Sequence, residues 1–235
     1  MTPEASTRAY ARVAGAAYLV ITIVALLYGA LVESKLIVSG NDAATANNIL
    51  AHASSFRVGI VLVLVIYASV FVASWALYVI LRTVDENLAL LALLLRSAEA
   101  IVGAATVLLS FAVLYVLEGG GSSNAFEPEQ LQALAGRFID VRTAGLDIVL
   151  VFIGLGATVF CVLLFRSRYI PKPLAAWGVF TYLSMLGLAL VSIVYPNHPL
   201  MLANVLYAVG ALFEFVLGLW LLFKGVDLQQ WDEHA

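Results

Sequence analysis

Three charged residues stand deep inside apolar runs of this sequence, where a membrane segment normally excludes them. Glu99 and Glu214 are carboxylates, and Arg96 precedes Glu99 by three residues. A charged side chain near the bilayer centre costs roughly 2.5 to 3.5 kcal/mol on translocon scales, so three unpaired ones would cost about 8 to 10 kcal/mol. These side chains must therefore face one another or a polar cavity, and the sequence predicts a polar site within the membrane.

Polar residues continue from these charges at helical spacing. Thr106 and Ser110 follow Glu99 at intervals of seven and four residues, so they share one helix face with it. We expect an ion pair between Arg96 and Glu214, with Glu99 beside it, because the first two lie roughly 12 to 13 Å from the same end of their helices. The predicted ligand-binding or proton-relay residues are Arg96, Glu99, Glu214, Thr106, Ser110, Asn204 and Tyr207.

Two carboxylates and one guanidinium would leave a surplus negative charge in this site. Protonation of one glutamate relieves that charge most simply. Such a carboxyl group can relay protons, hydrogen-bond a ligand or act as a general acid. The alternative is structural, because a buried ion pair can fix the packing of helices and bind nothing.

Composition places these residues in an integral membrane protein. With 63% hydrophobic and 11% charged residues and a mean hydropathy of +1.01, the chain lies outside the range of soluble domains. Short connections after the second and fourth apolar stretches predict helical hairpins. We predict an all-α bundle in one domain, residues 1–235, with six transmembrane helices of about 20 residues or more at 12–32, 56–81, 88–117, 141–165, 174–195 and 200–223.

A second ion pair is predicted nearer the outer side of this bundle. Arg57 begins the second span, and Asp147 lies roughly 9 Å into the fourth span. Arg142 competes with Arg57 as the cation. The sequence therefore predicts an Arg57–Asp147 pair apart from the central site.

Short amphipathic helices are predicted in two outer loops. A turn and N-cap signal at residues 39–42 precedes apolar residues at helical spacing that continue to Phe56. A similar stretch begins at Glu127-Pro128 and continues to Phe138. The two helices would either form a lid or shield the ends of the spans from lipid headgroups.

The distribution of basic residues predicts the orientation. Arg8, Arg12, Arg82, Arg166, Arg168, Lys172 and Lys224 lie on the side of the termini, and Lys35, Arg57, Arg137 and Arg142 lie on the other. Because basic residues concentrate on the cytoplasmic side, seven against four predicts cytoplasmic N- and C-termini. We expect a multi-pass protein of the cell inner (plasma) membrane of a prokaryote.

Several classes of site are excluded or disfavoured. The single cysteine, Cys161, excludes an intrachain disulfide and a thiolate metal cluster. The loops are too weakly basic for a nucleic-acid interface, and HExxH and GxSxG motifs are absent. We expect no metal and no cofactor, with membrane lipids and a small amphipathic ligand as partners.

Several segments of the chain resemble one membrane-protein family. They are Arg12–Leu19, Asp42–Ile49, Phe56-Arg57, Ala76–Tyr78, Leu95–Ala100, Phe165–Ser167, Glu214 and Leu219–Gly225. Through them nearly the whole chain resembles a bacterial and archaeal family described as domain of unknown function 4386. One departure is Pro-Lys-Pro-Leu-Ala-Ala from Pro171, where the family usually has a Gly-rich Pro-x-x-Leu-Gly stretch. The resemblance implies a polytopic membrane fold and brings no established activity or catalytic residue.

The leading hypothesis is a membrane protein that binds or passes a small amphipathic or lipid-like molecule in a polar pocket around Arg96, Glu99 and Glu214. One form of it couples this passage to protons, although no span has the central proline of a broken transporter helix. One alternative is a membrane enzyme that acts on a lipid or isoprenoid-like substrate, with a buried glutamate as the acid. The other is a structural or accessory subunit whose charged cluster only fixes helix packing.

Overall fold

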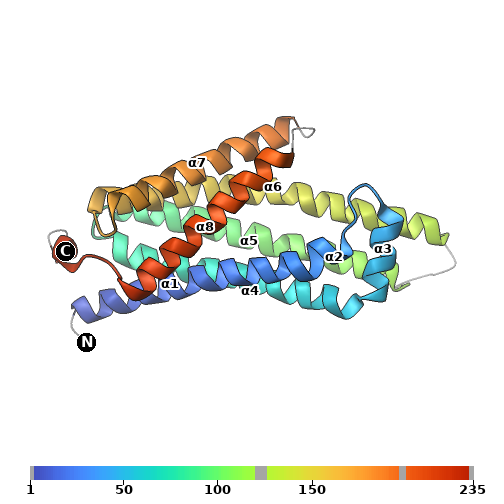
Figure 1. Cartoon of the computed structure of the whole chain (residues 1–235), viewed down its shortest axis with the longest axis horizontal. Coiled ribbons are helices and arrows are strands. Elements are labelled where there is room, and N and C mark those ends of the chain that lie inside the picture. Colours follow the sequence, from blue (N-terminus) through green and yellow to red (C-terminus); the bar gives the residue numbers. More distant parts are fainter. Residues whose placement is uncertain (1–2, 120–125, 196–199, 233–235) are drawn as a thin grey trace.

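The protein is a bundle of long helices that run roughly along one axis (Figure 1). The computed structural model describes residues 3–119, 126–195 and 200–232. In this part of the chain six helices are long and apolar enough to span a membrane, which confirms the predicted all-α membrane bundle. They are α1 (Pro3–Tyr28), which continues through η1 (Gly29–Glu33) and α2 (Ser34–Leu36), α4 (Ala53–Leu81), α5 (Glu86–Leu117), α6 (Pro128–Ser167), α7 (Lys172–Val194) and α8 (Leu200–Phe223).

The two ends of the bundle differ in what they carry. Both chain termini lie at one end, together with the short helix α9 (Leu228–Asp232), and we name it the termini end. The opposite end carries the short helix α3 (Asp42–Ala51), and we name it the α3 end (Figure 1).

Of the two predicted amphipathic stretches, one is a separate helix and the other is part of a span. The first is the separate helix α3, which Asn41 caps by accepting a hydrogen bond from the Ala44 amide, and a non-helical His52 separates it from α4. The second is helical but continuous with the fourth span, so α6 is 40 residues long. Glu127 and Gln130 form a capping box at its start, and no proline interrupts the helix beyond its first turn.

Neighbouring spans pack as antiparallel hairpins. The predicted hairpins α4–α5 and α6–α7 are confirmed, and α6 also packs along α5. Helix α1 lies between α4 and α8, and α8 also contacts α7. Helices α5 and α8 therefore lie on different sides of the bundle rather than side by side.

The buried apolar residues form two clusters. The larger one extends from the termini end toward the middle and draws on α1 and α4 to α8. The smaller one, at the α3 end, joins Ile49 of α3 to residues of the first four spans, among them Phe56 and Ile139. The apolar face of α3 thus closes the core at the α3 end.

Helices α1 and α8 cross at a point of close backbone contact. A Cβ atom on Gly15 would lie 2.5 Å from the amide nitrogen of Leu222 and 2.7 Å from the carbonyl oxygen of Gly218. Small residues permit such close approach between membrane helices. Figure 1 shows α8 passing obliquely over α1 from this region toward the α3 end.

Candidate functional site

Arg96 and Glu99 form an ion pair inside the bundle. The side chains of both residues are only 2% exposed, and the Arg96 Nη1 and Glu99 Oε2 atoms are in contact. The residues lie three apart on α5, so one helix holds both partners. Helix α6 reaches them closely because Gly156 has no side chain: a Cβ there would lie 3.0 Å from Arg96 Cγ.

Glu214 is placed differently from the prediction. It is half-buried on α8 and accepts a hydrogen bond of 2.9 Å from the hydroxyl of Tyr182 on α7. The predicted Arg96–Glu214 ion pair is wrong, because Arg96 pairs within α5 and α8 packs on α1 and α7 instead of on α5.

Thr106 and Ser110, the next polar residues along α5, line a cavity of about 180 Å³ on the α3 side of the ion pair. The cavity lies between α1 with its π-helical extension, α4, α5 and α6. Most of its wall is apolar and includes Val32, Phe56, Ile60, Val63, Ile66 and Leu146. It is therefore a mainly apolar space with a few polar groups.

The polar groups of the cavity meet at one corner around a second ion pair. Arg142 Nη2 donates to Glu33 Oε1 at 2.9 Å, and the hydroxyl of Tyr28 donates to the same oxygen at 2.8 Å. Arg142 Nη1 also donates to Ser110 Oγ at 3.5 Å. These four residues, Tyr28, Glu33, Ser110 and Arg142, are named the polar corner. It joins α1, α5 and α6.

The π-helical turn makes the polar corner possible. The Ser34 amide bonds to the Gly29 carbonyl, five residues back, instead of four residues back as in an α-helix. Tyr28 and Glu33 are also five residues apart, and this turn brings their side chains together. Such turns are frequent at functional sites.

Tyr67 separates the cavity from the Arg96–Glu99 pair. It is a lining residue on α4, and its ring lies against Gly103, where a Cβ would come within 2.0 Å of the Tyr67 Cζ atom. Gly103 is one helical turn from Glu99 on α5. The cavity and the buried ion pair are thus neighbouring features with an aromatic ring between them.

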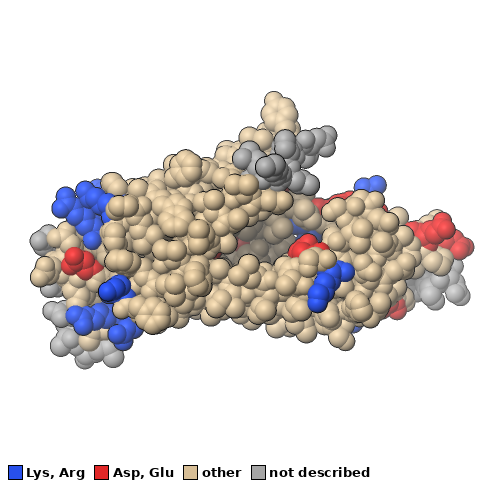
Figure 2. All heavy atoms as spheres, viewed as in Figure 1, with Lys and Arg blue, Asp and Glu red and all other residues tan. Residues whose placement is uncertain are grey.

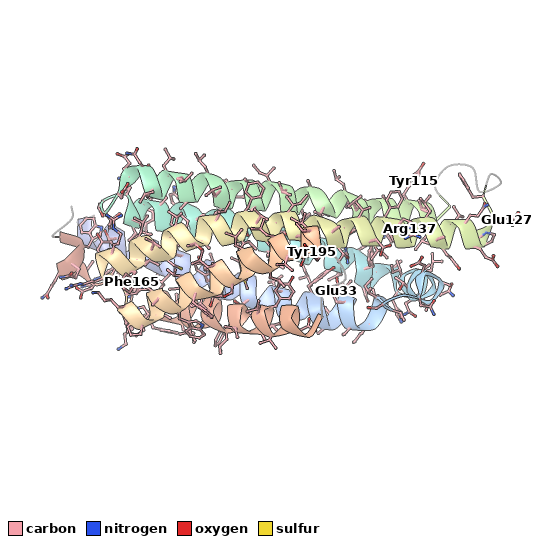
Figure 3. All side chains as sticks on the ribbon, turned by 90° about the horizontal axis from the view of Figure 1, so that it is seen from above. Glu33, Tyr115, Glu127, Arg137, Phe165 and Tyr195 are labelled. Carbon is pink, nitrogen blue, oxygen red and sulfur yellow. The ribbon has the colours of Figure 1, made fainter. Side chains whose placement is uncertain are left out.

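The side of the bundle is hollowed. Figure 2 shows a hollow in the face where α8 and the end of α1 diverge in Figure 1, with acidic and basic atoms together at its edge. In the turned view of Figure 3, Glu33 lies near the level of Tyr195, the residue after α7, whereas α6 continues far past this level toward Glu127. Helices α7 and α8 therefore leave the α3 end of the bundle uncovered.

Two residues of the predicted site lie outside this arrangement. Tyr207 is 41% exposed, and Asn204 is also exposed. Both lie on the part of α8 beyond its crossing with α1, where the helix leaves the bundle. Neither residue lines the cavity between α1, α4, α5 and α6.

The predicted partner of Arg57 is wrong. Arg57 Nη2 pairs with Glu118 Oε2 at 2.7 Å, because the start of α4 and the end of α5 meet at the α3 end. Asp147 lies deeper, since α6 begins at Pro128 and not near residue 141. Arg142, the predicted competitor, pairs with Glu33.

Sequence reasoning missed Glu33, Tyr28, Tyr67 and Tyr182. Glu33 lies one residue past the predicted end of the first span. The signal that could have found it was Arg142, a cation in the predicted fourth span without an assigned carboxylate. The partners of the three tyrosines depend on helix packing, which the sequence does not show.

The part of the chain that the structure describes holds no group of three or more His, Cys, Asp or Glu residues that could bind a metal ion. The chemistry that its polar groups can perform is recognition by hydrogen bonds and charge. Arg142 and Tyr28 are donors, and Glu33 is the acceptor between them.

The chain belongs to the family described as Domain of unknown function (DUF4386), which matches residues 13–225. The match covers all six spans almost completely, including the Arg96–Glu99 and Glu33–Arg142 ion pairs and the cavity. No curated protein and no solved structure matches the chain.

Proposed function

We propose that this member of the family binds a small amphipathic or lipid-like molecule in the cavity between α1, α4, α5 and α6, and passes it to or from the membrane. The observation that supports the proposal is the combination of an apolar wall with one polar corner. Ligand sites in proteins are typically concave, mostly apolar and fitted with a few placed polar groups.

The shape of the cavity suits a molecule with one polar head and one apolar tail. Glu33 lies three residues from the end of the first span, and this supports a position of the head near the headgroup level. The lining residues of α4 extend from Phe56 to Tyr67, roughly 16 Å along the helix axis. The tail would extend from the polar corner toward the bundle centre, and entry would be through the hollowed side (Figure 2).

The charges of the polar corner favour a head with both donors and acceptors. Glu33 and Arg142 already neutralise each other, so a head with a net charge would leave one of them unbalanced. A hydroxyl, amide or zwitterionic head can accept from Arg142 and donate to Glu33. We therefore propose an uncharged or zwitterionic amphiphile.

The burial of the Arg96–Glu99 pair favours a structural role for it, separate from ligand binding. Both side chains are paired on one helix and nearly inaccessible, and Tyr67 lies between them and the cavity. We propose that this pair fixes the packing of α5 and α6. A proton relay through Glu99 would require Tyr67 to move aside.

The Arg142→Gln variant is expected to lose the bound molecule, because the head loses its charged donor. Native mass spectrometry of protein purified in mild detergent would identify small molecules that co-purify with each form. Arg137→Gln is the matched control, since Arg137 lies on the same helix, pairs only with Asp140 among the described residues, and has a 78% exposed side chain.

Retention by the wild type and the Arg137→Gln variant, with loss from the Arg142→Gln variant, would support the binding function and name the ligand class. If none of the three carries a molecule while all unfold at the same temperature, the binding proposal is wrong. If a bound lipid is found chemically altered in the wild type alone, the enzyme alternative is favoured.

We also propose that the termini end faces the cytoplasm of a prokaryotic cell, in its plasma membrane. The seven basic residues at the termini end, against four near the α3 end, support this orientation. A cysteine placed at Gln229 in a Cys161→Ala background should react with an impermeant maleimide only in inside-out vesicles. A cysteine at Ala43 of α3 should react only in right-side-out vesicles, and the reverse pattern would refute the orientation.

A further inference from the structure

Two adjoining hollows lie at the termini end, around the segment that joins α8 to α9. The first, of about 360 Å³, is lined by Arg8 and Arg12 of α1 and by Lys224. The second, of about 390 Å³, is lined by Lys224, by Arg168 directly after α6 and by Lys172 at the start of α7. Figure 2 shows basic atoms gathered at this end of the molecule.

The five cations come from three separate parts of the chain, and among the described lining residues Asp227 alone is acidic. Asp227 lines both hollows, and its Oδ1 already accepts from the Gln229 amide at 3.0 Å. Within the described residues none of the five cations forms an ion pair, although the Lys172 ammonium lies 5.5 Å from the centre of the Phe165 ring. The hollows therefore carry an excess of positive charge.

An aromatic side chain borders each of the two hollows. Trp220 lines the second hollow, and Phe223, which is 75% exposed, lines the first. Tryptophan is enriched at the membrane–water interfaces of membrane proteins. In a bound phospholipid, the acyl chain would contact the apolar side chain, and the phosphate would contact the cations of the hollow.

We infer that these two hollows bind the phosphate headgroups of anionic phospholipids. Lys224 is shared between them, so the two sites adjoin and can be filled by two lipids or by one lipid with two phosphates. This site is separate from the cavity at the other end of the bundle and does not depend on its ligand.

Tryptophan quenching by brominated lipids tests the inference, because bromine quenches only rings that it contacts. The full chain is reconstituted in phosphatidylcholine vesicles that contain either dibrominated phosphatidylglycerol or dibrominated phosphatidylcholine. We expect stronger quenching by the anionic lipid, and a Trp220→Phe variant should remove most of that excess.

Two double variants of equal charge separate a site from a general surface charge. Arg168→Gln with Lys172→Gln removes two cations of the second hollow, whereas Arg82→Gln with Arg166→Gln removes two cations at the same end that line neither hollow. The first is expected to lower the preference for the anionic lipid at least about fivefold, and the second much less. Lys224→Gln alone, which changes both hollows, provides a second variant if the first does not fold.

The outcomes are distinct. An excess that persists in the Arg82/Arg166 variant and falls in the Arg168/Lys172 variant supports the lipid site. No excess in the wild type, or an equal fall in both variants, overturns it. Loss of the excess on adding inorganic phosphate, at an ionic strength held constant with chloride, would assign the hollows to free phosphate and overturn the lipid assignment.

Discussion

The Arg96→Ala variant is expected to lower the free energy of unfolding by about 3 kcal/mol or more. The substitution leaves Glu99 buried without its counter-ion, and breaking a buried pair from one side is strongly destabilising. It also removes the long side chain that fills the space beside Gly156. Thermal or denaturant unfolding of the detergent-solubilised protein, followed by tryptophan fluorescence, would measure the loss.

A second substitution identifies the partner of Arg96. Adding Glu99→Gln to Arg96→Ala should recover part of the lost stability, since it removes the uncompensated charge. Adding Glu214→Gln should recover less, because Glu214 is bonded to Tyr182 on another helix. Equal recovery by both, or recovery by neither, would contradict the pairing seen within α5.

The Gly15→Ala variant is expected to destabilise the protein by about 2 to 3 kcal/mol. The new methyl group would overlap the backbone of α8 at Gly218 and Leu222, and backbone cannot move aside as a flexible side chain can. The two helices would have to separate along their contact. The loss should appear as a lower midpoint in the same unfolding experiment.

Gly187→Ala is the matched control for this prediction. Gly187 also lies within a spanning helix, but nothing lies within 4 Å of the position that its Cβ would occupy. Alanine favours a helix over glycine by up to about 1 kcal/mol, so this variant should be neutral or slightly stabilised. A similar loss in both variants would mean that the close crossing of α1 and α8 is not what makes Gly15 sensitive.

The number and kind of the spans could be predicted because hydropathy and length are properties of local sequence. The start of the fourth span could not be predicted. Residues 128–140 are amphipathic, and such a stretch can form either a separate helix or the first part of a longer helix such as α6. Its buried face contacts α3 and α5, which only the folded chain brings there. Tertiary packing thus determined whether the two helical stretches join into one helix.

Several residues of the candidate site could be predicted from the sequence, but the ion pairs that they form could not. The single face formed by Arg96, Glu99, Thr106 and Ser110 follows from helix periodicity, and most of it is buried in the structure. The choice of Glu99 over Glu214 depends on which helices are neighbours. Periodicity carries no information about that, nor about the exposed end of α8 that bears Tyr207.

The π-helical turn of η1 makes the number of residues between Tyr28 and Glu33 important. In a regular α-helix, residues five apart point about 140° away from each other, so Tyr28 and Glu33 could not both face Arg142. Deleting one residue between them would remove the π-helical turn and leave an ordinary α-helix in which the two residues are four apart. The spacing of these two residues, more than their identity alone, then marks which relatives have inherited the same polar corner.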